Sequence, residues 1–244
     1  MPTLSHLDRH EKAFILIPMT KHIKGKAMTL EYSKTLGGIG SILLFISVIP
    51  FIQYLWVIGL VGVALILVAL HDLSNYYTSK GVFRNAIYGI VAGIVGIIMA
   101  VAVAVVAVLV NLSNINNFIS TLYPAWNGDW STLSGLTPNT SNITSTNMLS
   151  FITETILVVI AVLAIIWIFA IISAFFVRRS LKEVSEESHV GSFGTAGILL
   201  LIGAFLIILF GLGLLLMWIA ALILAIAFFN LKPHEQPRRH STFS

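Results

Sequence analysis

Glu154 is the acidic side chain nearest the interior of a long apolar segment, and it is therefore the first candidate for chemistry. Carboxylates inside membrane segments are costly and often functional, for example as members of proton relays. Because Glu154 closely follows Ser150, we also expect it in the first turn of a helix, where the helix dipole and lipid headgroups favour an anion. Both roles stay open, since the sequence shows no partner for a proton relay.

A second kind of chemistry is glycan attachment. Three N-x-Ser/Thr acceptor sequons occur in the chain, at Asn111, Asn139 and Asn142, and all three fall within one polar segment rich in Ser, Thr and Asn. This segment is therefore predicted to be an exposed extracellular loop with glycans at Asn139 and Asn142. Asn111 is the weaker acceptor, because it lies next to the predicted membrane edge.

A stripe of small residues is the third candidate site. Its members are spaced by three and four residues, so they share one face of a helix: Gly89, Gly93, Gly96, Ala100, Ala104 and Ala107. Small residues let two helices approach closely inside a membrane. The stripe is therefore predicted to pack either against other passes of the same chain or against a second copy in a homo-oligomer.

Other catalytic and ligand-binding patterns are excluded by what the chain lacks. Cysteine is absent, which excludes disulfides, thiolate metal sites and Cys nucleophiles. His71, Asp72 and His189 do not have metal-ligand spacing. The glycines at 37, 38 and 40 have neither the preceding strand nor the Lys-Ser or Lys-Thr ending of a phosphate loop. We therefore expect no cofactor, no metal site and no enzymatic activity.

Composition and apolar runs define the elements that carry these residues. Hydrophobic residues make up 57% of the 244 positions and charged residues 10%, and a soluble fold of this size could not bury so much apolar surface. Two outer runs, 36–70 and 194–229, hold about 35 residues each, and two inner runs, 86–110 and 151–176, hold about 25 each. An outer run would be ~50 Å long as one helix, against ~30 Å of hydrocarbon. Each outer run is therefore predicted to be a hairpin with short arms, and each inner run a single tilted span.

The distribution of the 14 Lys and Arg residues predicts the sides of the membrane. Six precede residue 36, two lie in 71–85, three in 178–182 and three after 230, whereas 111–150 has none. Cytoplasmic loops collect Lys and Arg. Both termini are therefore predicted to be cytoplasmic and the loop 111–150 extracellular, which gives six passes. Pro50 with Gln53, and Gly211 with Gly213, are the predicted hairpin turns, and the hairpins either cross fully or turn within the membrane.

The predicted organisation is an all-α, polytopic transmembrane bundle. Its parts are a basic cytoplasmic extension (1–35), a hairpin (36–70), a span (86–110), the outer loop (111–150), a span (151–177), a cytoplasmic loop (178–193), a hairpin (194–230) and a cytoplasmic tail (231–244). In the cytoplasmic loop, Arg179–Glu183 and Lys182–Glu186 are spaced for ion pairs on a helical extension. The basic residues sit only at the edges of apolar runs, so lipid headgroups are the expected partner and nucleic acid is not.

Several segments resemble one known family. They are SKTLGGIGSILLFISVIPF, HDLSNYYTSKGVFRNAIYGIVAGIVG and GILLLIGAFLIILFGLGLLLMWIAALILAIAFF, and together they cover roughly residues 34–229 except the outer loop. They are similar to the archaeal membrane proteins grouped as the domain of unknown function 996 family. The resemblance implies an archaeal plasma membrane, and it supplies neither an activity nor catalytic residues. Residues before Met28 depart from the family's usual start, which favours treating them as an extension.

Function is predicted mainly from the scarcity of polar side chains in the apolar runs. Ion-coupled transporters and pumps need ionisable or carbonyl-rich sites at the membrane midplane. We therefore expect a non-enzymatic structural or accessory subunit of a membrane assembly, in contact with other membrane protein subunits or with a second copy. A small transporter or channel with a mostly apolar pathway is the alternative.

Overall fold

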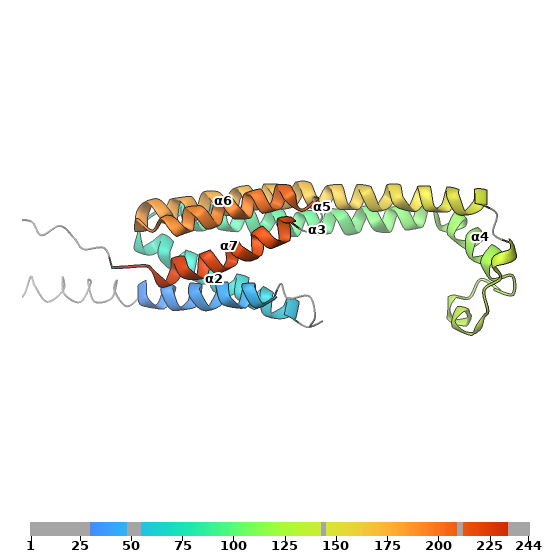
Figure 1. Ribbon diagram of the computed structural model, residues 1–244, viewed down its shortest axis with the longest axis horizontal. Coiled ribbons are helices and arrows are strands. Elements are labelled where there is room, and N and C mark those ends of the chain that lie inside the picture. Colours follow the sequence, from blue (N-terminus) through green and yellow to red (C-terminus); the bar gives the residue numbers. More distant parts are fainter. Residues whose placement is uncertain (1–29, 48–54, 143–144, 209–211, 234–244) are drawn as a thin grey trace, which may run out of the picture. The chain divides into compact units, whose positions relative to one another are not determined.

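The computed structural model describes residues 30–47, 55–142, 145–208 and 212–233. These residues form helices, turns and loops, with no strand among them, so the predicted all-α class is confirmed. After a first helix over residues 30–47, the elements in chain order are α2 (Leu55–Tyr76), α3 (Lys80–Val110), α4 (Leu112–Leu122), the 3₁₀ turns η1 (Trp130–Gly135) and η2 (Thr140–Asn142), α5 (Ser145–Ser188), α6 (Gly191–Leu206) and α7 (Leu212–Phe229) (Figure 1).

Within the described ranges, four helices are long and apolar enough to cross a membrane. They cover Val57–Tyr76, Lys80–Val110, Phe151–Ser188 and Leu212–Phe229, and Gly191–Leu206 is a shorter apolar helix. These helices indicate a membrane protein. The predicted turn residues Pro50, Gln53 and Gly211 lie outside the described residues, as do the chain before residue 30 and most of the C-terminal tail.

Both inner helices are longer than the apolar runs that predicted them. α3 begins at Lys80 rather than at residue 86, and α5 runs from Ser145 through the mixed-charge stretch to Ser188. The predicted helical extension beyond the second span is therefore confirmed. The predicted outer loop is partly helical, because it contains α4 and both 3₁₀ turns.

The chain divides into two compact units, and α3 and α5 contribute to both. The first unit comprises Met1–Ile90 and Ile171–Ser244, and the second comprises Val91–Ala170. The first unit is therefore discontinuous in sequence, since its two parts are separated by the whole of the second.

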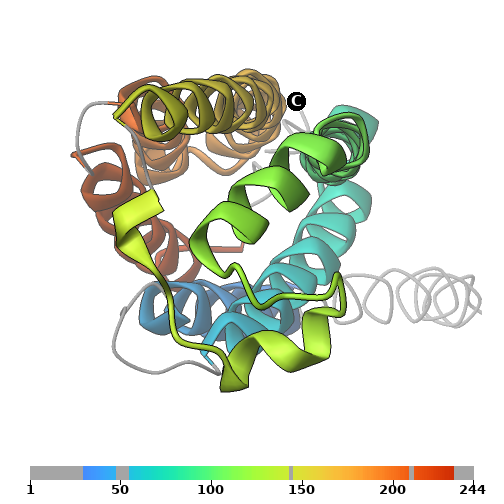
Figure 2. The same cartoon turned by 90° about the vertical axis from the view of Figure 1, so that its right-hand side faces the viewer.

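In the first unit, neighbouring helices follow one another around a common axis (Figure 2). The order is the helix over residues 30–47, α2, α3, α5, α6 and α7, which returns to the first helix. Each step is marked by a close contact, namely Gly40–Gly62, His71–Phe83, Val82–Ser180, Arg178–Gly197, Gly203–Gly213 and Gly37–Phe228.

Glycines let the two arms of each hairpin approach closely. A Cβ atom on Gly40 would lie 2.7 Å from the backbone oxygen of Gly62 in α2, and one on Gly203 would lie 2.9 Å from that of Gly213 in α7. Real Cβ atoms do not approach backbone oxygens so closely, so only glycine fits at these crossings. Short arms can therefore pack along their backbones, as expected where lipid removes the hydrophobic incentive for helix association.

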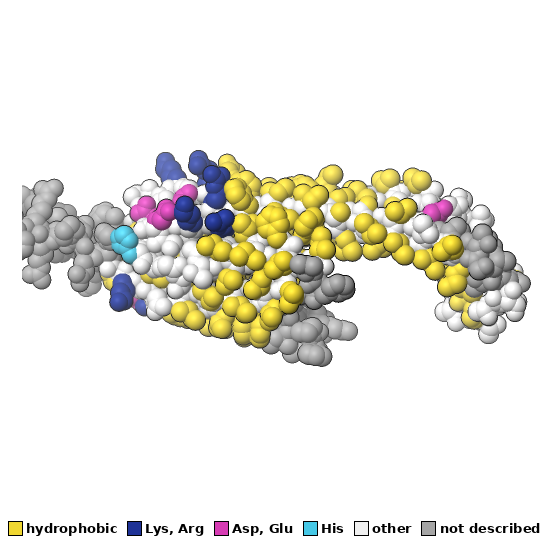
Figure 3. All heavy atoms as spheres, turned by 45° about the horizontal axis from the view of Figure 1, so that its top comes forward, with side chains coloured by type: hydrophobic (Ala, Val, Ile, Leu, Met, Phe, Trp, Pro, Cys, Tyr) yellow, Lys and Arg dark blue, Asp and Glu magenta, His cyan; other side chains and the backbone are white. Residues whose placement is uncertain are grey.

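The best-packed part of the first unit lies near its charged end. Phe193 of α6 and Phe228 of α7 are fully buried and meet edge to face, with ring centroids 5.0 Å apart. Side chains from every helix of the unit join them, including Leu30, Leu73, Val82, Leu181, Val184 and Leu231. Figure 3 shows the Lys, Arg, Asp and Glu side chains of this unit gathered at one end, with an apolar surface beyond them.

In the second unit, Val91–Val110 of α3 and the part of α5 up to Ala170 run side by side (Figure 1). Gly96 of α3 fits against Phe169 of α5. The outward faces carry large apolar side chains, of which Ile97, Leu109 and Leu157 are each more than 60% exposed. Helix α4 packs onto α5 through Phe118, whose ring stacks on that of Phe151 with centroids 4.1 Å apart.

Candidate functional site: a pocket beside Glu154

Asn111 shapes the junction that creates the pocket. It separates α3 from α4, and its side-chain nitrogen donates a hydrogen bond to the carbonyl oxygen of Ala107 at 2.9 Å. The backbone nitrogen of Asn111 bonds to the same oxygen at 3.1 Å. The carbonyl of Ala107, in the last turn of α3, thus receives two donors. Helix α4 starts at the next residue, and its first turn brings Asn114 opposite α5.

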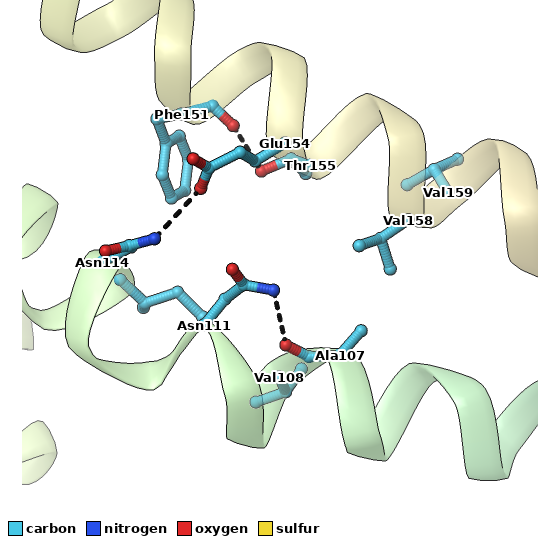
Figure 4. A pocket seen from close by; sticks show the side chains of 10 residues that line it. Ala107, Val108, Asn111, Asn114, Phe151, Glu154, Thr155, Val158 and Val159 are labelled. Carbon is cyan, nitrogen blue, oxygen red and sulfur yellow. Dashed lines mark hydrogen bonds between the residues drawn. The ribbon is translucent and has the colours of Figure 1, made fainter.

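The pocket lies between this junction and α5, and its volume is about 120 Å³. Its walls are mainly apolar, and polar atoms enter from three sides (Figure 4). The lining residues are Ala107, Val108, Asn111, Asn114, Ile115, Phe151, Glu154, Thr155, Val158 and Val159.

Glu154 is exposed, and it takes a hydrogen bond from α4. The side-chain nitrogen of Asn114 donates to the Oε2 atom of Glu154 at 3.2 Å. The predicted position of Glu154 in the first turn of its helix is wrong, because α5 begins at Ser145 and Glu154 lies more than two turns further on. The effect of the helix dipole falls off within the first turn. In the structure, therefore, the carboxylate interacts with Asn114 and not with the helix N-terminus.

No cation of the second unit can neutralise Glu154. Residues 91–170 contain no Lys, Arg or His, and their charged side chains are Asp129 and Glu154. Asp129 caps the start of the turn η1, where bonds from the backbone nitrogen and the hydroxyl of Ser131 hold the pKa of its carboxyl below the usual range. The unit thus carries two negative charges and no positive one.

The small-residue stripe lies on the side of α3 that faces α5. In the first unit, a Cβ atom on Gly89 would lie 2.8 Å from Cγ2 of Val177 and 3.1 Å from the backbone oxygen of Ser173. In the second unit, Gly96 and Ala100 are buried, and Gly93, Ala104 and Ala107 are half-buried. Gly89 and Gly96 therefore pack against α5 of the same chain, and the role of the stripe as a whole stays a prediction.

The sequon asparagines differ in their surroundings. The amide nitrogen of Asn111, the atom that would carry a glycan, is bonded to Ala107 inside the pocket wall. Asn139 is exposed, and its side-chain oxygen accepts a bond from the backbone nitrogen of Ser141 at 3.1 Å. Asn142 ends the turn η2, and Thr144 of its sequon lies outside the described residues. Glycosylation at Asn139 and Asn142 stays a prediction.

A polar contact that sequence reasoning missed joins α5 to the start of α3. Glu183 accepts hydrogen bonds from the Asn85 side-chain nitrogen at 2.9 Å and from the Ser79 hydroxyl at 3.3 Å, and its carboxylate also contacts Gly81. The spacing in the sequence predicted an ion pair between Arg179 and Glu183, but the Arg179 guanidinium lies over the Phe175 ring, 5.3 Å from its centroid. The sequence feature that could have indicated this contact is Asn85, a polar residue at the start of an apolar span.

The remaining charged candidates form local contacts. Lys182 and Glu186 make the predicted ion pair at 3.5 Å. His71 contacts Asp72 at 3.4 Å and meets the edge of Phe83 near the end of α2. Among the described residues, no group of three His, Asp or Glu side chains could hold a metal ion.

Comparisons with known proteins give matches of unassigned function. A family model described as a protein of unknown function (DUF996) matches residues 58–222. An uncharacterized protein of Methanocaldococcus jannaschii is 29% identical over 204 residues, which cover 84% of this chain and 94% of that protein. No solved structure matches the chain.

Proposed function

This chain belongs to the DUF996 family of proteins of unknown function, and we propose that it is a non-enzymatic structural or accessory subunit of a membrane assembly. The observation that carries the proposal is the outward surface of the second unit. Gly89 and Gly96 of α3 pack against α5, while the large side chains of Ile97, Leu109 and Leu157 are mostly exposed. Such a surface fits lipid tails and the helices of other membrane proteins.

The polar side chains of the hairpins support this proposal over transport. Ser41 donates to the Gly37 carbonyl at 2.8 Å and Ser47 to the Leu44 carbonyl at 2.7 Å, both within one helix. The indole nitrogen of Trp218 donates to the Phe45 carbonyl at 2.9 Å, across two helices. These groups satisfy the backbone rather than line a path for a polar solute, whereas transport sites need polar groups at the midplane.

The proposed arrangement has six passes in the plasma membrane. The termini and the charged end of the first unit are cytoplasmic, in contact with anionic headgroups, and residues 111–150 are extracellular. Two features support this arrangement. Basic side chains gather at one end of the first unit (Figure 3), and residues 111–150 contain no Lys or Arg.

Purification of the full-length tagged chain from its native membrane in a mild detergent tests the proposal. We expect one or more membrane proteins to co-purify in fixed stoichiometry, as measured by mass spectrometry and by native mass. A chain that purifies alone and moves a solute across the membrane of a proteoliposome would contradict the subunit role and favour the transporter.

A further inference from the structure

We propose that the pocket beside Glu154 binds a small organic ammonium ion that carries a short apolar chain. This inference does not depend on the proposed function, because either a subunit or a lone chain could hold such a ligand. It follows from the acceptors in the pocket, from the charge of the second unit and from the character of the walls.

The pocket offers hydrogen-bond acceptors to a ligand. The side-chain nitrogens of Asn111 and Asn114 already donate, to Ala107 and to Glu154. The Thr155 hydroxyl donates to the Phe151 carbonyl at 2.8 Å. Each amide nitrogen keeps one further N–H. The carboxylate of Glu154 and the amide oxygen of Asn111 can both accept from a ligand, and Figure 4 shows this oxygen directed toward α5. A primary ammonium group supplies three donors and no acceptor.

Charge selects a cation over a neutral donor. Within residues 91–170 no Lys, Arg or His can pair with Glu154, and its hydrogen bond comes from a neutral amide. Hydrogen bonds in which the donor or the acceptor is charged are roughly twice as strong as neutral ones, and a cationic donor adds the attraction between opposite charges. A bound ammonium ion would supply the missing countercharge.

The walls favour an organic ion over a metal ion. Ala107, Val108, Val158 and Val159 are aliphatic, and Phe151 adds a ring that is held in place by stacking on Phe118. An alkyl chain can pack against such walls, whereas a hydrated metal ion gains nothing from them, and the face of Phe151 can also attract a cation. The volume of about 120 Å³ is close to that of engineered apolar cavities that hold one small organic molecule.

The test is a binding titration of the purified full-length chain in a nonionic detergent, with ligand-observed NMR as the readout. The probe is n-butylammonium, and n-butanol is its neutral counterpart. We expect n-butylammonium to bind. We expect the affinity for n-butanol to be lower by about tenfold or more. The substitution Glu154→Gln should weaken n-butylammonium binding by about tenfold or more, because it removes the charge and keeps an acceptor for Asn114.

Asp129→Asn is the matched control, since it removes the same charge from the same unit outside the pocket. It should leave the affinity within about twofold. Val158→Phe fills the pocket and should abolish binding of both probes, so a second variant remains if Glu154→Gln fails to fold. Equal binding by Glu154→Gln and the parent chain, or an equal loss in Asp129→Asn, would overturn the proposal.

A lipid with a primary ammonium headgroup offers the same chemistry as a free amine. The titration is therefore repeated in nanodiscs of phosphatidylethanolamine and of phosphatidylglycerol. Loss of n-butylammonium binding in phosphatidylethanolamine discs alone assigns the pocket to a lipid headgroup, and equal binding in both assigns it to a free amine. Loss of binding in both kinds of disc would contradict the proposal that the pocket binds an organic ammonium ion.

Discussion

Gly96 is a residue at which a small side chain is required by a neighbour. A Cβ atom there would collide with Phe169 of α5. We expect Gly96→Leu to lower the free energy of unfolding by ~1–3 kcal/mol, as overpacking of a well-filled site does. The measurement is denaturant unfolding of the purified chain in detergent, with circular dichroism as the signal.

Val101→Leu is the control for Gly96→Leu, because it also enlarges α3 but lies 56% exposed on the outward face. It should change stability by less than about 0.5 kcal/mol. If the two variants unfolded alike, or if only Gly96→Leu changed the native mass, the stripe would not be a purely internal packing face.

Tyr77 gives the molecule a predictable response to alkaline pH. Burial, with smaller contributions from Tyr76 and Glu187, raises the pKa of Tyr77 to about 12, and within the described residues its hydroxyl has no hydrogen-bond partner. In the unfolded chain a tyrosine titrates near ~10. The stabilising contribution of the protonated phenol is therefore complete below about pH 10 and is lost as pH rises through about 12.

Tyr77→Phe should reduce this alkaline loss of stability and leave stability at neutral pH unchanged or slightly higher, since it removes an unsatisfied buried hydroxyl. Unfolding midpoints measured from pH 7 to 12 check the prediction. Tyr32→Phe, at a position 58% exposed, should retain the alkaline loss of the parent chain. A Tyr77→Phe profile that matched the parent throughout would show that other groups control the response.

At the element scale, the contact of Glu183 with the start of α3 fixes the register of two helices. The carboxylate accepts from Asn85 and Ser79, and the Ser180 hydroxyl one turn earlier donates to the Val82 carbonyl at 2.6 Å. Glu183→Ala should lower the free energy of unfolding by ~1–3 kcal/mol, because hydrogen bonds to a charged group are lost and Asn85 is left without its acceptor. The same denaturant titration measures the loss.

Glu186→Ala is the matched variant on the same helix. Its ion pair with Lys182 is exposed on both sides, and such pairs contribute about 0–1 kcal/mol. A similar cost for both glutamates would mean that Glu183 acts only as a surface charge.

The helix ends show how far sequence reasoning reaches at this scale. The end of α3 at Val110 was predicted, since Asn111 interrupts an unbroken apolar run. The start at Lys80 was not, because it depends on Ser79 and Asn85 meeting a glutamate about 100 residues away in the chain. Helix α4 was missed as well, because its Ser- and Asn-rich sequence resembles a loop. The stacking of Phe118 on Phe151, which packs this helix against α5, is not visible in the sequence.

The candidate site was predictable only in part, because its residues are far apart in the chain. A lone acid in an apolar segment identified Glu154, but no local pattern relates it to Asn114, which is 40 residues away and reaches it only because α4 turns back after Asn111. The pocket depends on that turn. Apolar periodicity predicts which residues avoid water, whereas the side chains that meet across helices are determined by the crossing geometry.

At the scale of the whole molecule, the absence of cysteine makes the proposed topology directly testable. A single cysteine introduced at Ser134, an exposed position in the proposed outer loop, should react with a membrane-impermeant maleimide in intact cells. Lys182→Cys, at a side chain 67% exposed on the proposed cytoplasmic side, should react only after the cells are opened. The reverse pattern would show that the topology is inverted. Reaction of both in intact cells would refute the single pass proposed between them, because two sites on the same side are separated by an even number of passes.

The discontinuous first unit has a consequence for how the protein is made. The helix over residues 30–47 finds its partners in α7, since Gly37 and Gly38 contact Phe228 and Phe229, and Phe45 stacks on Trp218 with ring centroids 4.5 Å apart. Domains generally fold as units during synthesis, but this unit cannot close until the last helix has left the ribosome. The nascent chain must therefore hold its first hairpin without α7 while α3 and α5 are inserted, and the first unit closes only after α7 has been made.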